Sequence, residues 1–184
     1  VNTKILVDFR ESYLKKLKKL SNKNTTITDK MPPNFKYVGL ICSAFPDAKI
    51  VHVKRNSAAT CWANYKQHFT TKSLGYSYDL NDLITYYGLY QNLMKFWEEQ
   101  YGDRIYTLNY ETLTINQEDE TRKLIQYLDL KWEQECLSPQ NNKRNVSTSS
   151  SSSKQIRQKV YQDSSLKWKK FEPFLNGAFN QLDD

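Results

Sequence analysis

Hydrophobic positions along the chain follow two spacings, one helical and one extended. Apolar residues recur every three or four positions with polar residues between them, which predicts helices over residues 8–20, 34–45, 57–69, 79–101 and 118–128. Short runs rich in β-branched residues predict strands over residues 27–29, 49–53 and 105–109. Strands that alternate with helices in this way are typical of an α/β domain with a largely parallel sheet.

Polar residues at the ends of these segments support the predicted boundaries. Ser57 is the predicted N-cap of the helix after the second strand, and Asp79 or Asn81 is the predicted N-cap of the longest helix. A serine-rich run at residues 147–153, STSSSSS, is typical of a flexible loop. Because a folded pattern resumes after this run, we expect one domain over residues 1–184.

Composition narrows the class of partner without choosing it. The 184 residues are 39% hydrophobic and 14% aromatic, which indicates a folded domain with a sizeable core. Lys and Arg outnumber Asp and Glu by 27 to 20, and the net charge is +7. This balance favours an anionic partner, which could be a nucleotide, an acidic substrate, a polyanion or a nucleic acid.

Cysteine and histidine usage argues against a metal centre and a disulfide framework. Cys42, Cys61 and Cys136 are widely separated, and neither they nor His52 and His68 have the spacing of metal ligands. No apolar run approaches the length of a membrane span, and no signal peptide is visible. We therefore expect a cytoplasmic protein without a metal and without membrane contact.

Two basic residues follow predicted strands at positions suited to an anion. Arg55 comes directly after the strand in KIVHVKRN, and the helix that Ser57 opens offers backbone N–H groups and a partial positive charge. Such an edge is where open α/β sheets bind phosphates. Lys30 ends the strand before the prolines of TDKMPPNF, where it can place a charge on a developing anion. Taken without further motifs, the local pattern around Arg55 favours a surface arginine with an ordinary cap, and Lys30 is compatible with a solvated lysine in a proline turn.

Several motifs in one order are similar to those of a known family. The chain contains TDKMPPNF, VGLI, FPDAKIVHVKRN, LNYETL and QIRQKVYQDSSLKWKKFEPFL. In this order they resemble sulfotransferases that use the donor PAPS (3'-phosphoadenosine-5'-phosphosulfate), closest to a bacterial branch related to tyrosylprotein sulfotransferases. The resemblance runs from about Leu14 to about Leu175. It implies a P-loop-like three-layer α/β sandwich, which would be incomplete here because the first strand and its loop are missing.

The resemblance implies a set of donor-binding residues. Arg55 matches the arginine that holds the 3'-phosphate of the donor. The family's serine on the same phosphate falls at Ala63, and Asn64, Thr60 or Ser57 could substitute for it. Two further residues match donor contacts in this family: Tyr110 in LNYETL and Lys167 before Trp168.

The resemblance also implies catalytic residues. Lys30 matches the lysine that stabilises the bridging oxygen as sulfate transfers. The segment after the serine run resembles the donor lid, in which Ser152 matches a serine that assists the lysine. Gln155, at the start of the matching segment, is counted among the donor-binding residues.

One part of the family pattern has no counterpart in this sequence. The family's first strand leads into a PRSGTT-like loop whose backbone amides cradle the 5'-phosphosulfate, and nothing here resembles it. The general base is not identifiable either. We therefore expect that the chain begins downstream of this loop or is degenerate, and that it is inactive alone.

The predicted function is transfer of a sulfuryl group from PAPS to the hydroxyl of a sugar, a peptide or a small molecule, with PAP (adenosine 3',5'-bisphosphate) as the product. The alternative is a basic, non-catalytic module that binds nucleic acid or another polyanion, because basic and aromatic residues interleave at residues 168–171. Lys30 and Arg55 at neighbouring strand ends favour the sulfotransferase, since the alternative has no need of them there.

Overall fold

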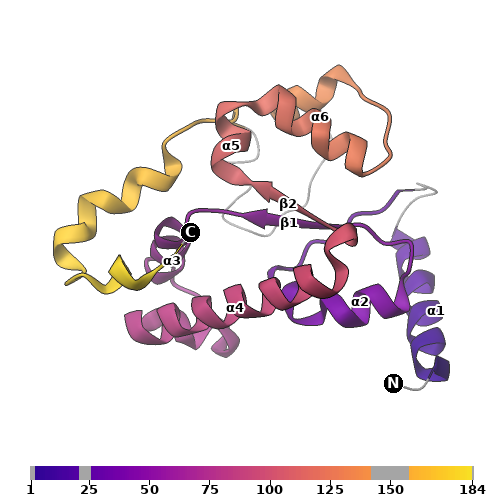
Figure 1. The fold of residues 1–184 in the computed structure, drawn as a ribbon, viewed down its shortest axis with the longest axis horizontal. Coiled ribbons are helices and arrows are strands. Elements are labelled where there is room, and N and C mark those ends of the chain that lie inside the picture. Colours follow the sequence, from indigo (N-terminus) through magenta and orange to yellow (C-terminus); the bar gives the residue numbers. More distant parts are fainter. Residues whose placement is uncertain (1–2, 21–25, 142–157, 184) are drawn as a thin grey trace. The chain divides into compact units, whose positions relative to one another are not determined.

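The computed structural model describes residues 3–20, 26–141 and 158–183 of the chain, whose helices and strands are drawn in Figure 1. The chain divides into two compact units, each made of two separate stretches. Unit 1 comprises Val1–Ile50 and Leu89–Ile105, and unit 2 comprises Val51–Gly88 and Tyr106–Asp184. The expectation of a single domain over residues 1–184 stays a prediction.

Unit 1 is built from helices and a small apolar core. Its elements are α1 (Thr3–Leu20), a 3₁₀ segment (Pro32–Tyr37), α2 (Val38–Ala44), the C-terminal half of α4 (Leu80–Tyr101) and a 3₁₀ turn (Gly102–Arg104). The buried centre of its core consists of Val38, Cys42, Met94 and Ile105. Partly buried side chains pack around it, including Phe35, Tyr90 and Trp97.

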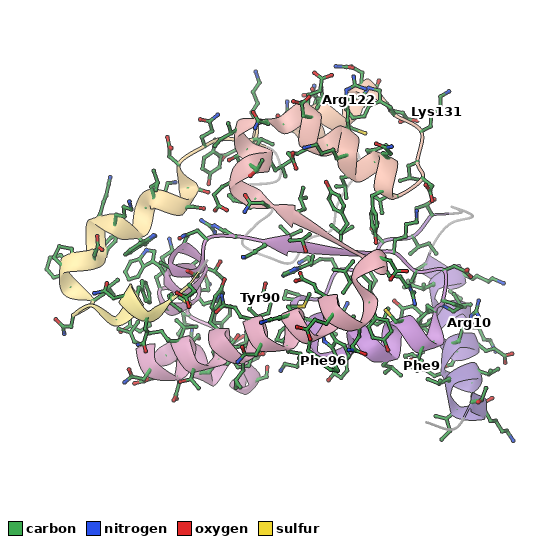
Figure 2. The ribbon with its side chains drawn as sticks, in the orientation of Figure 1. Phe9, Arg10, Tyr90, Phe96, Arg122 and Lys131 are labelled. Atoms are coloured by element: carbon green, nitrogen blue, oxygen red, sulfur yellow. The ribbon has the colours of Figure 1, made fainter. Side chains whose placement is uncertain are left out.

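Two contacts fix α2 between its neighbours in unit 1. Phe9 and Tyr13 of α1 pack edge-on against Phe45, with ring centroids 5.9 and 5.1 Å apart, and Figure 2 labels Phe9 on this helix. Arg104 donates hydrogen bonds to the carbonyls of Cys42, Phe45 and Ala48 at 2.9, 2.7 and 3.0 Å. Because the last carbonyls of a helix have no partner within it, the bond to Cys42 satisfies one of them, and the bonds to Phe45 and Ala48 hold the turn that follows α2.

Unit 2 holds most of the sheet and the remaining helices. Its elements are β1 (Ile50–Lys54), α3 (Ser57–Tyr65), a 3₁₀ segment (Lys72–Tyr78), the start of α4, β2 (Ile105–Asn109), α5 (Tyr110–Ile115), α6 (Gln117–Tyr127), short 3₁₀ turns (Gln134–Leu137 and Pro139–Asn141), and two C-terminal 3₁₀ segments, η7 (Ser164–Phe174) and η8 (Ala178–Gln181). β1 and β2 pair directly and run parallel (Figure 1). This mixed, parallel arrangement confirms the predicted α/β class, and the three-layer sandwich stays a prediction.

Some predicted boundaries are wrong. The strand expected over residues 27–29 does not form, because residues 26–31 have no regular secondary structure and lead into the 3₁₀ segment that Pro32 begins. Ile27 is 41% exposed, so burial does not stabilise an extended conformation there. The helix predicted over residues 57–69 ends at Tyr65, and Asn56 rather than Ser57 is its N-cap.

Candidate functional site

The turn from β1 into α3 carries the first residues of the site. β1 ends at Lys54, and Arg55 and Asn56 connect it to α3. The Asn56 side chain accepts a hydrogen bond of 2.9 Å from the backbone N–H of Ala59, which satisfies one of the free donors at the helix start. Ser57, the predicted cap, is instead the first helical residue and is buried.

Arg55 is held by residues from two distant parts of the sequence. Its Nε donates a 3.1 Å hydrogen bond to the Ser165 hydroxyl, and its Nη2 donates a 3.0 Å hydrogen bond to the Ser164 carbonyl. Its guanidinium carbon lies 5.2 Å from the centroid of the Tyr110 ring, within the range of a cation–π contact. The structure therefore brings two predicted donor-binding residues, Arg55 and Tyr110, together.

A carboxylate joins the two sides of this cluster. Glu111, the second residue of α5, accepts the backbone N–H of Asn56 through both oxygens, at 3.2 and 3.3 Å. The Ser165 hydroxyl donates a hydrogen bond to the same carboxylate. Across the cluster, the Tyr110 hydroxyl and the Ser164 hydroxyl are 2.9 Å apart. The ends of both strands and the start of η7 thus meet at one point within unit 2.

The cluster has the chemistry of an anion site. It combines one guanidinium, the hydroxyls of Tyr110, Ser164 and Ser165, and the start of α3 with its partial positive charge. The carboxylate of Glu111 offsets part of this charge. A doubly charged phosphate suits the guanidinium better than a neutral group does, because charge-assisted hydrogen bonds are about twice as strong as neutral ones.

Two other predicted donor-binding residues lie in the same unit without contacting this cluster through any bond the structure gives. Asn64 donates from its amide to the Thr60 carbonyl within α3 at 3.0 Å. Lys167 lies in η7, with its ammonium 5.1 Å from the centroid of the Tyr161 ring. Their predicted contacts with a nucleotide stay predictions.

The aromatic residues of η7 pack within unit 2. Phe171 stacks on Trp62 with centroids 4.5 Å apart, and Trp168 meets Phe179 edge-on at 5.7 Å. Phe171 keeps 44% of its surface exposed. The first contact attaches η7 to α3, and the second attaches η7 to η8. Binding of a polyanion at residues 168–171 stays a prediction.

The catalytic roles of Lys30 and Ser152 stay predictions. Lys30 is an exposed residue of unit 1, in the stretch between α1 and the first 3₁₀ segment. Its neighbour Asp29 accepts a hydrogen bond from Tyr13 of α1. Ser152 and Gln155 lie outside the described residues. Because residues 26–31 form no strand, the expectation that Lys30 lies at a strand end is wrong, and its proximity to Arg55 stays a prediction.

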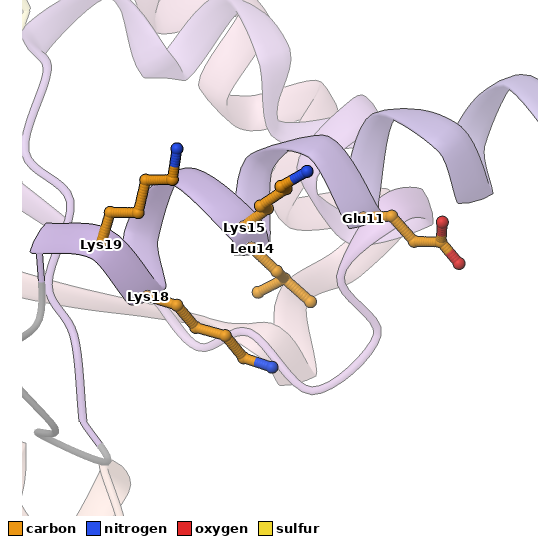
Figure 3. Close-up of a pocket in the computed structure, with 5 residues that line it drawn as sticks. All are labelled: Glu11, Leu14, Lys15, Lys18 and Lys19. Carbon is orange, nitrogen blue, oxygen red and sulfur yellow. The ribbon is translucent and has the colours of Figure 1, made fainter.

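An open pocket of about 470 Å³ lies on the surface of α1 (Figure 3). Its lining consists of Glu11, Leu14, Lys15, Lys18 and Lys19, none of which was predicted as a site residue. Over residues 3–20, 26–141 and 158–183, no group of His, Cys, Asp and Glu side chains could hold a metal ion. Within those same ranges, no helix has both the length and the apolar character needed to cross a membrane.

Sequence reasoning missed three members of the cluster: Glu111, Ser164 and Ser165. Glu111 directly follows Tyr110, and the two serines lie just before Lys167, so each stands beside a residue that was predicted. The sequence does not show that Ser165 contacts Arg55, because the two residues are 110 residues apart along the chain.

Comparisons with known proteins agree with the motif order. A family model described as "Sulfotransferase family" matches residues 5–134. An uncharacterized protein of Aquifex aeolicus (strain VF5) is 34% identical over 183 residues, which cover 98% of this chain and 24% of that protein. The chain therefore spans about a quarter of the length of this relative.

Proposed function

Because this chain belongs to the sulfotransferase family, we propose that it binds PAPS and serves the transfer of its sulfuryl group to an acceptor hydroxyl. The observation that carries this proposal is the cluster at the end of β1, where Arg55 lies over Tyr110 and beside Ser165. Arginine and hydroxyls at the carboxyl end of a parallel strand suit the phosphate of a nucleotide.

In this proposal the cluster holds the adenosine side of the donor. Arg55 binds the 3'-phosphate, and Tyr110 contacts the nucleotide. Ser57, Asn64, Gln155 and Lys167 complete the donor site. PAP, the product of transfer, keeps the 3'-phosphate and is therefore a suitable probe of the same contacts.

The remaining predicted residues, Lys30 and Ser152, act in the transfer step of this proposal. The acceptor oxygen forms a bond to sulfur while the bond from sulfur to the bridging phosphate oxygen breaks, and the acceptor proton goes to a base that the sequence does not identify. Negative charge develops on the bridging oxygen. Lys30 stabilises that charge with its ammonium, and Ser152 assists by donating a hydrogen bond. Catalytic turnover also requires a loop that binds the 5'-phosphosulfate of the donor.

The test is a comparison of two nucleotides that differ in one phosphate. Arg55→Ala should weaken binding of PAP by about tenfold to a hundredfold, since a charge-assisted contact contributes about 1.5–3 kcal/mol. Binding of adenosine 5'-phosphate (AMP), which lacks the 3'-phosphate, should change much less. Isothermal titration calorimetry on the full chain measures both affinities.

Arg122→Ala provides the matched control. Arg122, which Figure 2 labels, is an exposed residue of α6, and its guanidinium pairs with the Glu118 carboxylate at 2.7 Å. It removes the same charge and should leave the preference for PAP over AMP unchanged. Equal losses of both ligands in Arg55→Ala would mean that Arg55 contributes only to the general field. No binding of PAP by the wild-type chain would contradict the proposal.

A further inference from the structure

We propose that Glu111 and Ser165 are positioning residues that orient the Arg55 guanidinium toward a ligand phosphate. This inference rests on the proposed function, since it assigns how the phosphate-binding arginine is held. Neither residue needs to touch the ligand. Glu111 accepts a hydrogen bond from Ser165, and Ser165 accepts one from Arg55, so Glu111 acts on Arg55 through Ser165.

The Ser165 hydroxyl has only one proton, and the carboxylate of Glu111 accepts it. The oxygen therefore faces Arg55 with its lone pairs, and the Nε–H of Arg55 donates to it at 3.1 Å. A hydroxyl that was free to rotate could point its proton toward the guanidinium instead. Glu111 thus fixes the direction of the hydrogen bond from Arg55 to Ser165.

Three contacts then determine which part of the guanidinium remains for a ligand. Nε–H and one Nη2–H lie on the same edge of the planar group, and the Ser165 hydroxyl and the Ser164 carbonyl accept from that edge. The Tyr110 ring covers one face at 5.2 Å. Within the described part of the chain, Nη1 makes no hydrogen bond that the structure gives. The edge formed by Nη1 and the second Nη2–H is the one that can bind a phosphate with two parallel hydrogen bonds.

Glu111 is itself held in place at a second point. The backbone N–H of Asn56 donates to both carboxylate oxygens, so the carboxylate is anchored to the turn that carries Arg55. Ser165 is 8% exposed, which limits the water available to replace these bonds. The pair therefore links β1, α5 and η7 through one serine and one carboxylate.

Removing the charge of Glu111 should change the preference for PAP over AMP in opposite directions, depending on whether Glu111 positions Arg55 or acts only through its charge. Glu111 is an anion beside a proposed anion site, so its charge alone opposes phosphate binding. If charge were its only effect, Glu111→Gln would increase the preference for PAP over AMP. If Glu111 orients Ser165 and Arg55, the same substitution decreases that preference, because the guanidinium loses its fixed direction.

The experiment measures the ratio of the AMP and PAP dissociation constants by calorimetry for the full chain. We expect Ser165→Ala and Glu111→Gln each to lower this ratio by about three- to tenfold, the effect of about one hydrogen bond. Ser43→Ala and Glu118→Gln are the matched controls, since Ser43 donates within α2 and Glu118 pairs with Arg122 on α6. Both should keep the wild-type ratio. A general loss of structure would weaken both ligands and leave the ratio unchanged.

A double-substitution cycle tests whether the pair acts through Arg55. In an Arg55→Ala background, Ser165→Ala should have no further effect on the ratio, because the group that it orients has been removed. A further decrease would mean that Ser165 contacts the phosphate directly and would overturn the positioning role. An unchanged ratio in a Ser165→Ala variant that keeps the wild-type affinity for AMP, or an increased ratio in Glu111→Gln, would overturn it as well. A wild-type chain that binds PAP no better than AMP would remove the proposed function, and with it this inference.

Discussion

At the scale of single residues, position 63 separates this chain from the family that it resembles. Ala63 lies in α3, eight residues after Arg55, where that family has a serine on the 3'-phosphate. The amide of the neighbouring Asn64 already donates to the Thr60 carbonyl within the helix. Position 63 therefore offers no hydroxyl, and Asn64 has one of its donors in use.

Restoring the hydroxyl tests the importance of this difference. Ala63→Ser should strengthen PAP binding by about fivefold, the effect of about 1 kcal/mol from one added hydrogen bond, and should leave AMP binding unchanged. Calorimetry with both nucleotides measures the effect, and AMP serves as the control for any change in the fold. An unchanged PAP affinity would indicate that Asn64 or Thr60 already fills this role.

The cluster around Arg55 shows how much of the candidate site the sequence could predict. Arg55 was a candidate because it lies between a predicted strand and a predicted helix, whereas Tyr110 was predicted only because LNYETL resembles a family motif. Ser165 and Glu111 were not predicted, since their importance depends on which distant segment packs against β1. Hydrophobic spacing predicts elements, and it does not predict which polar side chains two elements bring together.

At the scale of elements, the packing of α2 on α4 depends on a glycine. A Cβ added at Gly39 would lie 2.9 Å from two atoms of the Trp97 ring, closer than carbon atoms pack. Trp97 has little freedom to move away, because its indole N–H donates a 2.8 Å hydrogen bond to the Phe35 carbonyl. The absence of a side chain at Gly39 thus allows the two helices to approach.

Replacing glycine with alanine should change the free energy of unfolding in opposite directions at Gly39 and at Gly88. Gly39→Ala should lower the free energy of unfolding by about 1–3 kcal/mol despite the better helix propensity of alanine, because the core of unit 1 becomes overpacked. Gly88→Ala in α4 meets no atom within 4 Å and should raise it by about 0.5–1 kcal/mol. Urea unfolding of both variants measures the two signs. A stabilised Gly39→Ala variant would show that α2 and α4 can separate without cost.

The helices and strands differ in how well the sequence predicted them. β2 and α4 match their predictions closely. The pattern of β2 comes from its β-branched residues. α4 begins after Asp79, whose carboxylate accepts hydrogen bonds from the backbone N–H groups of Asn81 and Asp82. The strand at residues 27–29 was wrong because a strand needs a neighbour to pair with and a face to bury, and two β-branched residues in a row provide neither. α5 was not predicted, although Asn109 caps it.

At the scale of the whole molecule, both units contain a group whose ionisation the fold opposes. Burial raises the pKa of the Cys61 thiol in unit 2 to about 12, and this side chain has no exposed surface. In unit 1, burial and the hydrogen bond to Asp29 raise the pKa of Tyr13 to about 12. In each case the folded state keeps a proton that the unfolded chain releases at a lower pH.

The chain should therefore lose stability at alkaline pH, and Cys61 and Tyr13 should each contribute to the loss, together with other groups whose pKa burial raises, such as Cys42 and Tyr90. Above pH 9, the ordinary thiol pKa, the unfolded chain binds fewer protons than the native chain because of Cys61, so the free energy of unfolding falls as pH rises toward 12. Above pH 10 Tyr13 adds to the fall. Urea unfolding from pH 7 to 12 should show a nearly constant value at first and a decline afterwards. Cys61→Ala should flatten the decline from pH 9, whereas Tyr13→Phe should flatten it only above pH 10, so each variant is the control for the other. A decline that neither substitution changes would place its origin in other groups.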